Sequence, residues 1–309
     1  METTIFAGKG GVGKSTCAAA YALHQAGSCR VNIINFDGGH AIPRVLALNG
    51  QKLPYNRSAC TGIDNLSVAL AAPLGFTPIS NIDRRDDACI ERYFSQFKGD
   101  LGLVPYCDMA ATYLGLPLDM KYISKFASLV ELFHNAKIED AENIVVDVEA
   151  TAGLESMLSS VELMTARIKS LRDSNWAKLR AMAVAYPAAS AFLKSEYIEN
   201  FNVYAERLAE VSAAIKEADY FVVCIPEESP VEEMRQIVMV LRGFGGKVRG
   251  YVINNIRGEP HEGEQMIKIR SGANGHRIVE IPHCIGLCAN DTAARIAELR
   301  GVGEKLARG

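Results

Sequence analysis

Residues 8–15 read GKGGVGKS and fit the phosphate-binding pattern GxxxxGK[ST] at every fixed position. The loop follows the apolar run at residues 4–7 and precedes the helix-prone stretch at residues 16–25, so it has the strand–loop–helix context that this pattern requires. Its glycines let backbone N–H groups converge on a polyphosphate, and the positive end of the following helix favours the same anion. An accidental glycine-rich turn is the alternative, and the flanking strand and helix argue against it.

The loop predicts a nucleotide site with separate roles for its groups. We expect backbone N–H groups to hold the α- and β-phosphates, Lys14 to neutralise the β- and γ-phosphates, and the Ser15 hydroxyl to bind Mg²⁺. A second lysine, Lys9, is more than an ordinary loop of this kind needs. The predicted nucleotide-binding residues of the loop are Gly8, Lys9, Gly10, Gly11, Val12, Gly13, Lys14, Ser15 and Thr16.

Composition limits the classes of protein that the chain can belong to. Its 309 residues, 49% of them hydrophobic, are enough for one large domain. Eight dispersed cysteines and a start without a basic-then-apolar leader predict a reduced, cytoplasmic protein, with peripheral membrane contact as an option. No uncharged run approaches the ~18 residues of a membrane span. A net charge of −3 gives no general attraction to nucleic acid, so we expect no nucleic-acid partner.

Strand-like and helix-like stretches alternate along the chain, which predicts an α/β fold with a doubly wound, mostly parallel sheet and an inserted helical subdomain. We expect one domain over residues 1–309, with the helical subdomain contributed by about 42–143 and 154–218. Apolar residues in the second stretch recur at helical spacing in two sets, which Pro187 divides. The expected strands are residues 3–7, 31–35, 144–148, 220–225, 248–254 and 277–281.

Three polar residues close predicted strands near the loop. Asp37 ends the second strand, where its carboxylate can orient the attacking water or hold a water on Mg²⁺; an Asx turn is the alternative. Asp147 ends the strand NIVVD and would approach the metal's second shell, whereas a helix cap for a segment starting near Leu154 is too distant. Asn254 ends the strand YVINN, and its amide can pair with a purine edge, unless it only starts a loop.

Together these motifs resemble the dimeric ATPases with a deviant Walker A loop, and most of all the arsenite-pump and tail-anchored-protein-targeting ATPases. NFDGGHA is similar to their first switch, with Asp37 and His40 matching, and DVEATAG to their second switch, with Asp147 and Thr151 matching. IPEE, VINN and IVEIPH are similar to later family segments. The resemblance implies that Asn254 reads adenine, that Pro282 forms a nucleotide-site turn, and that Lys9 reaches the partner subunit's site.

The chain also departs from this family's pattern. Glu149 and Ala150 replace the small residue and proline of the second switch, and the local DxEA resembles nickel-inserting ATPases. The zinc-binding CxxC pair that follows VINN in targeting members is missing. Instead, Cys284 and Cys288 could complete a zinc or cluster site shared across a dimer, or they could be buried core residues.

The resulting functional prediction is a Mg²⁺-dependent ATPase that works as a nucleotide-switched homodimer. The catalytic residues expected are Asp37, Lys9 and Lys14, with ATP and Mg²⁺ as cofactors and Ser15 and Asp37 as metal ligands. The dimer would act on a membrane-protein client or a membrane transporter subunit. Metallocentre maturation and metalloid or oxyanion efflux are the alternatives; Cys60, Cys89 and Cys107 are candidate soft ligands for efflux.

The apolar helical faces of residues 154–218 have two possible interpretations. Met157, Met164 and Met182 would suit an adaptable client-binding surface, because methionine is flexible and polarisable. The alternative, which we favour for any single methionine, is that these faces form core. DNA partition is the least supported role, because no basic stripe follows the switches.

Overall fold

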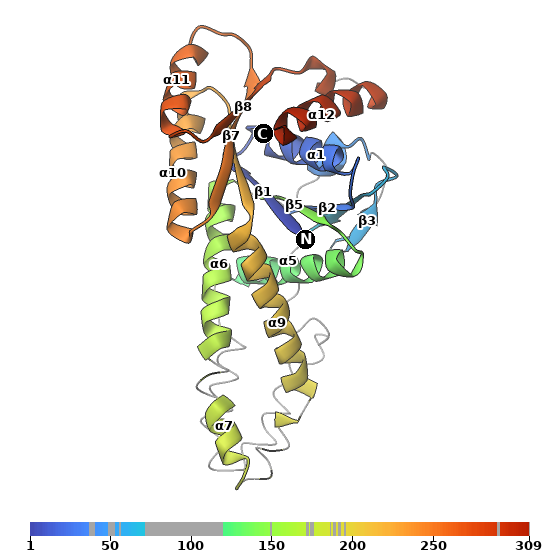
Figure 1. Cartoon of the computed structure of the whole chain (residues 1–309), viewed down its shortest axis with the longest axis vertical. Coiled ribbons are helices and arrows are strands. Elements are labelled where there is room, and N and C mark those ends of the chain that lie inside the picture. Colours follow the sequence, from blue (N-terminus) through green and yellow to red (C-terminus); the bar gives the residue numbers. More distant parts are fainter. Residues whose placement is uncertain are drawn as a thin grey trace. The chain divides into compact units, whose positions relative to one another are not determined.

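The computed structural model describes the chain except residues 37–40, 49–52, 56, 72–119, 149, 171–172, 174–175, 186, 188–189, 191–192, 195, 289–290 and 309 (Figure 1). Predictions for Asp37, His40, Glu149, Cys89 and Cys107 therefore lie outside the described residues.

An eight-stranded sheet forms the centre of the fold, with the order β3-β4-β2-β5-β1-β6-β7-β8. All paired strands are parallel except β3, which runs antiparallel to β4. The predicted α/β class is confirmed. The strands are β1 (Glu2–Gly8), β2 (Val31–Asn35), β3 (Ser58–Cys60), β4 (Leu66–Leu70), β5 (Asn143–Asp147), β6 (Asp219–Cys224), β7 (Lys247–Ile256) and β8 (Arg277–Pro282).

Six of these strands agree with the predicted runs to within one or two residues, because strands buried on both faces are continuous β-branched or aliphatic runs. Sequence reasoning missed β3 and β4, which lie in the stretch that we assigned to the helical subdomain. β3 has three residues and forms the edge of the sheet, so it has too little pattern to detect.

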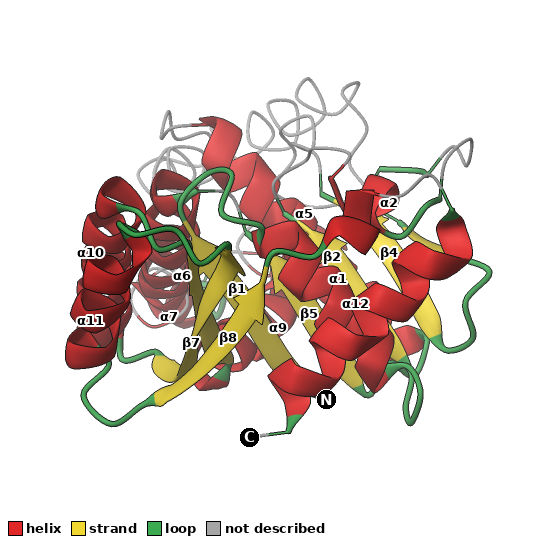
Figure 2. Cartoon of the chain, turned by 90° about the horizontal axis from the view of Figure 1, so that it is seen from above, coloured by secondary structure: helices red, strands yellow, loops and turns green. Residues whose placement is uncertain are grey.

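Helices cover both faces of the sheet (Figure 2). α1 and α12 pack together on one face of the sheet. On the other face α10 packs against β6, β1 and β7, and α11 packs against α10. The helices of the described chain are α1 (Lys14–Gln25), α2 (Ala41–Val45), α5 (Met120–Ile138), α6 (Thr151–Ser170), α7 (Trp176–Met182), α9 (Glu196–Glu217), α10 (Glu228–Phe244), α11 (Glu262–Gly272), the 3₁₀ helix η3 (Ile285–Cys288) and α12 (Thr292–Ala307).

The chain divides into two compact units. The first contains Met1–Ala72, Leu132–Leu158 and Ala213–Gly309, and it holds the sheet and the phosphate loop. The second contains Pro73–Glu131 and Ser159–Ser212. Within the second unit, ion pairing and hydrogen bonding join neighbouring helices: Arg207 contacts Glu131 at 3.0 Å, and the hydroxyls of Thr165 and Ser212 are 3.0 Å apart. The boundaries expected for the helical subdomain stay a prediction, because residues 73–119 lie outside the described part.

The periodic apolar faces of α6 and α9 are largely core. Met157 is 1% exposed, and Leu154, Val161, Leu208 and Ile215 are buried in the same way. The core reading of Met157 is confirmed, while Met164 and Met182 are half-buried. α6 begins at Thr151, so its predicted start near Leu154 was three residues late. The error arose because the apolar pattern becomes visible only at the first buried side chain.

A glycine allows α12 to approach α1 closely. A Cβ atom at Gly303 would lie 2.2 Å from the carbonyl oxygen of Ala20 and 2.7 Å from the Cβ of His24. Two residues earlier on α12, a Cβ atom at Gly301 would have nothing within 4 Å. The contact at Gly303 involves backbone, so the two helices would have to separate to accept a methyl group.

We expect Gly303→Ala to lower the free energy of unfolding by about 1–3 kcal/mol, because it overpacks the contact between the two helices. Gly301→Ala should be neutral or stabilising by up to about 1 kcal/mol, since alanine favours the helix. Urea denaturation of both variants measures the difference. Equal stabilities of the two variants would contradict the close approach of α12 to α1.

Candidate nucleotide-binding site

The phosphate loop leaves the sheet at β1, which lies between β5 and β6, and α1 begins at Lys14. Gly13 is the N-cap residue of α1 and has a left-handed backbone, with φ of 92°. The conformation favours glycine, and a Cβ atom at this position would lie 2.2 Å from Nδ2 of Asn254 and displace that amide. No side chain caps the start of α1 in the described structure, and its first N–H groups point towards the loop.

Lys14 lies against its own loop. Its side chain is 7% exposed, and Nζ donates a hydrogen bond of 2.9 Å to the carbonyl oxygen of Lys9. The ammonium group is thus held where a phosphate oxygen can replace that carbonyl as acceptor. Ser15 and Thr16 are half-buried in the first turn of α1. Their roles, and those of the other loop residues, stay predictions about the bound nucleotide.

Asn254 contacts the phosphate loop from the far end of the sequence. It lies near the carboxyl end of β7, and its Nδ2 donates a hydrogen bond of 2.9 Å to the carbonyl oxygen of Val12. This contact uses the amide as donor and leaves Oδ1 as an acceptor beside the loop. The sequence singled out Asn254 but did not indicate that the loop itself orients its amide.

One backbone hydrogen bond and one side-chain contact join the end of β7 to the turn after Pro282. The backbone N–H of His283 donates to Ile256 at 2.8 Å, and Nδ1 of His283 lies 2.6 Å from Oδ1 of Asn255, which has a positive φ of 61°. Pro282 therefore lies, like Asn254, at the carboxyl ends of the strands. Sequence reasoning missed the pairing of Asn255 with His283, although each residue is adjacent to one that it named.

Asp147 is fully buried at the end of β5, in register with Phe6 on β1 and with Asn35 on β2. Its charge acts on α1: burial, followed by the neighbouring Asp147 and Cys284, raises the pKa of the Cys17 thiol to about 12. The carboxylate thus lies close to the first turn of the helix that carries Lys14. Phe36, immediately before Asp37, donates its N–H to the Asp147 carbonyl at 2.8 Å, which aligns the ends of the two strands.

Lys9 makes contacts that the sequence did not predict. Its Nζ donates to Oγ of Ser229 and lies 3.7 Å from Oε2 of Glu233, and both partners are on α10. The second oxygen of Glu233, Oε1, accepts a hydrogen bond from the Thr151 hydroxyl at the start of α6. The segment IPEESPVEE contains both partners, but only its general likeness to the family was visible in the sequence.

The cysteine pair gains no support as a metal site. Sγ of Cys284 donates to the Pro282 carbonyl at 3.1 Å, and burial, followed by the nearby Glu298, raises the pKa of its thiol to about 11. Metal coordination needs a thiolate, which these surroundings disfavour. The side chain of Cys288 lies outside the described part. No group of three or more metal-ligating side chains occurs among the residues that are described.

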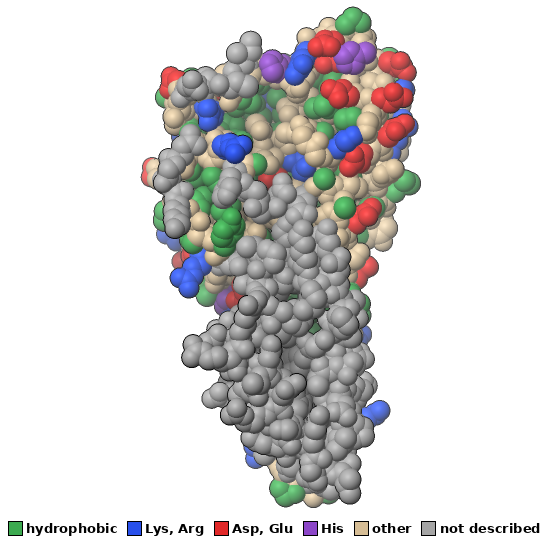
Figure 3. All heavy atoms as spheres, turned by 180° about the vertical axis from the view of Figure 1, so that it is seen from behind, with side chains coloured by type: hydrophobic (Ala, Val, Ile, Leu, Met, Phe, Trp, Pro, Cys, Tyr) green, Lys and Arg blue, Asp and Glu red, His purple; other side chains and the backbone are tan. Residues whose placement is uncertain are grey.

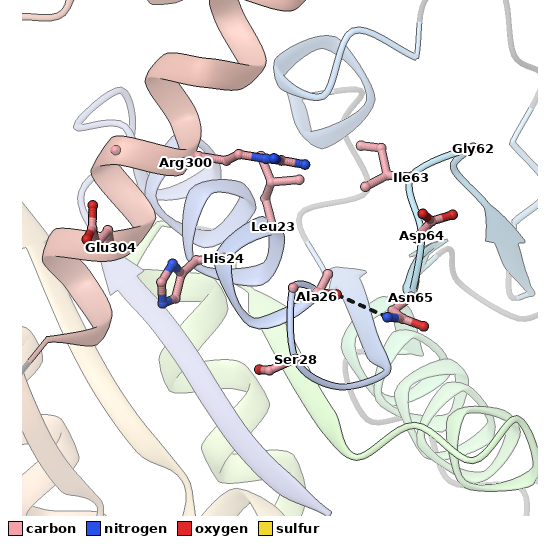
Figure 4. Close-up of a pocket in the computed structure, with 12 residues that line it drawn as sticks. Leu23, His24, Ala26, Ser28, Gly62, Ile63, Asp64, Asn65, Arg300 and Glu304 are labelled. Carbon is pink, nitrogen blue, oxygen red and sulfur yellow. Dashed lines mark hydrogen bonds between the residues drawn. The ribbon is translucent and has the colours of Figure 1, made fainter.

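A separate pocket of about 920 Å³ lies at the other end of α1 (Figure 4). Its lining includes His24 and Ser28 near the end of α1, Asn65 from the connection between β3 and β4, and Arg300 and Glu304 on α12. Nucleotides bind at the carboxyl ends of parallel strands, where the phosphate loop lies. This pocket lies at the amino ends of β2 and β4 instead, so it is not the nucleotide site.

The surface over α10 and α11 carries many acidic side chains (Figure 3). The exposed carboxylates in this region are Glu227, Glu228, Glu232, Glu259 and Glu264. None of the helices in the described ranges is both long and apolar enough to cross a membrane.

The family model of anion-transporting ATPases matches residues 1–284 of the chain. The match includes the phosphate loop, Asp147, Asn254 and Pro282, and it ends before η3 and α12. A search of curated protein sequences finds no significant match. The match covers far more than half of the 309 residues, and it agrees with the resemblance to arsenite-pump ATPases that the motifs indicate. The chain therefore belongs to the anion-transporting ATPase family and is a P-loop ATP hydrolase.

Proposed function

We propose that this ATPase works as a Mg²⁺-dependent homodimer whose nucleotide state controls its interaction with a client protein or a transporter subunit. The observation that carries the proposal is the contact of Asn254 with Val12, which joins the candidate base-reading residue to the phosphate loop. Asp147 approaches the same loop from β5. The phosphate loop, Asn254 and Asp147 lie at the carboxyl ends of parallel strands, where ligands bind in such sheets, which supports the proposal.

The orientation of Asn254 favours adenine. The Val12 carbonyl takes one N–H of Nδ2 and so orients the amide, which leaves Oδ1 and the second N–H to meet a base. Oδ1 is an acceptor, so it can accept a hydrogen bond from the amino group of adenine. Guanine presents a carbonyl oxygen at the corresponding position, and two acceptors repel each other. We therefore expect a preference for ATP over GTP.

The oxygen groups near the loop suit Mg²⁺. The Ser15 hydroxyl lies in the first turn of α1, and the buried carboxylate of Asp147 ends the neighbouring strand. Hard oxygen ligands are those that Mg²⁺ prefers, with water completing its shell. Bound Mg²⁺ would supply positive charge to the β- and γ-phosphates. Ser15 would be its direct protein ligand, and Asp147 would hold a metal-bound water.

The dimer is proposed from Lys9. Its side chain is 32% exposed, and the adjacent Gly10 and Gly11 are exposed as well, so this part of the loop can meet a second subunit. A second cation could not easily turn back onto phosphates that Lys14 would contact, since two ammonium groups repel at close range. Approach from a partner subunit avoids that crowding and adds charge to the transferring phosphoryl group, as an arginine finger does.

A groove in the second unit is the proposed contact for the client. It measures about 620 Å³, and its lining combines Ile168, Ala205 and Leu208 with the charged residues Lys169, Arg180 and Glu206. Such a mixed lining suits an amphipathic segment better than a purely apolar one.

The test is the oligomeric state of the purified protein with ATP, ADP or GTP, each with Mg²⁺ or with excess EDTA. We expect a dimer by light scattering only with ATP and Mg²⁺, and ATP hydrolysis under the same condition. ADP should bind without forming the dimer, because Lys9 of the partner would have no γ-phosphate to contact. A protein that hydrolyses ATP as a monomer at all concentrations would contradict the dimer proposal.

A further inference from the structure

One carboxylate, that of Glu233, connects the phosphate loop to the second switch. Its Oε2 lies 3.7 Å from Nζ of Lys9, and its Oε1 accepts from the hydroxyl of Thr151. Ser229, one turn earlier on α10, accepts a hydrogen bond from the same Lys9 ammonium. The lysine is therefore bound within its own subunit, by residues far away in the sequence.

Glu233, Thr151 and Lys9 belong to three different segments of the first unit. α10 is anchored to the sheet by Val231, Met234 and Ile237, all of which are buried, so Glu233 projects from a fixed helix. Thr151 is the first residue of α6 and follows the Asp147 strand end by four positions. A Cβ atom at Gly10 would lie 4.0 Å from the Cβ of Ala150, so the loop and the start of α6 are neighbours here as well.

We propose that Glu233 is the positioning residue for Lys9: it holds the lysine in its own subunit, and it releases the lysine towards the partner when ATP binds. Thr151 belongs to the second switch and binds the other oxygen of the same carboxylate. A shift of the second switch would therefore move the Glu233 carboxylate and change the acceptor that Lys9 uses. This inference rests on the proposed ATP-dependent dimer.

The strength of the contact fits a reversible restraint. The side chains of Lys9 and Glu233 are 32% and 24% exposed, and ion pairs in such positions are weak and screened by salt. A buried pair would be too costly to break in each cycle. The alternative is an ordinary surface ion pair without a role in switching, and it predicts no coupling between Glu233 and the response to ATP.

The test uses Glu233→Gln, which removes the charge but keeps an oxygen to accept the Thr151 hydrogen bond. Its control is Glu232→Gln, an exposed carboxylate of the same helix beside it. The ATP concentration for half-maximal dimer formation should fall by about two- to fivefold in Glu233→Gln, since Lys9 no longer has to leave an ion pair. Glu232→Gln should match the wild-type protein.

A further measurement reports on the contact of Lys9 itself. Acylation of Lys9 in the nucleotide-free protein, followed by peptide mass spectrometry, should be faster in Glu233→Gln than in Glu232→Gln.

The outcomes are distinguishable. If the wild-type protein forms no dimer with ATP, the proposed function fails, and this inference fails with it. If the wild-type protein forms the dimer but Glu233→Gln matches Glu232→Gln in ATP dependence, only the inference is overturned. A lowered ATP requirement together with faster acylation of Lys9 supports it.

Discussion

Replacing Lys14 with alanine should weaken nucleotide binding by about 30- to 5,000-fold. The ammonium group lies almost buried against the loop, 2.9 Å from the Lys9 carbonyl, and it is the cation placed to meet the β- and γ-phosphates. Truncating one partner of a buried, hydrogen-bonded charge pair costs about 2–5 kcal/mol, which corresponds to a loss of affinity of about 30- to 5,000-fold. Titration with a fluorescent ATP analogue measures the change.

The matched control is Lys268→Ala. Lys268 is also a helical lysine, but it lies at the surface of α11 and pairs with Glu264 four residues earlier. Its removal lowers the net charge by the same amount and should leave nucleotide affinity unchanged. Thermal unfolding of both variants checks that the fold is intact. Affinity of Lys14→Ala within a few-fold of the control would remove Lys14 from the phosphate site.

Mixing two inactive variants should restore ATP hydrolysis. We expect Lys9→Ala to bind ADP but to lose ATP-dependent dimer closure and most hydrolysis, and Asp37→Asn to bind ATP without turnover. In a mixed dimer, one site combines the intact Asp37 of one chain with the intact Lys9 of the other. Random pairing makes half of the dimers mixed, and each of these has one competent site of two, so about a quarter of the wild-type activity should return.

Differently tagged chains show by co-purification whether mixed dimers form. If they form and no activity returns, Lys9 acts within its own subunit, and the main chemical argument for the dimer is lost. The contact of Lys9 with Ser229 and Glu233 makes this experiment necessary, because a lysine bound on its own α10 has to move before it can act in a partner. An Asp37→Asn variant that hydrolyses ATP at the wild-type rate would refute the role given to Asp37.

Much of the fold could be predicted from the sequence because its determinants are local. The loop at residues 8–15 requires glycines at defined positions, and the φ of 92° at Gly13 agrees with that requirement. β2 was predicted with its observed limits, since five consecutive buried residues form a visible run. The same property explains why the short edge strand β3 was missed: its three residues are half-buried or exposed, and such a segment has no distinctive pattern.

The sequence by itself determined that this chain has a phosphate loop between a buried strand and a helix, in an α/β protein of the ATPase family. Only the tertiary structure decided which distant residues meet at that loop. Asn254 reaches Val12 across 242 positions of the sequence, and Lys9 reaches Ser229 across 220. Periodicity records which face of an element is buried, but it does not record the neighbour against which that face packs. The order of the strands fixes those neighbours, and with them the partners of Lys9 and Asn254.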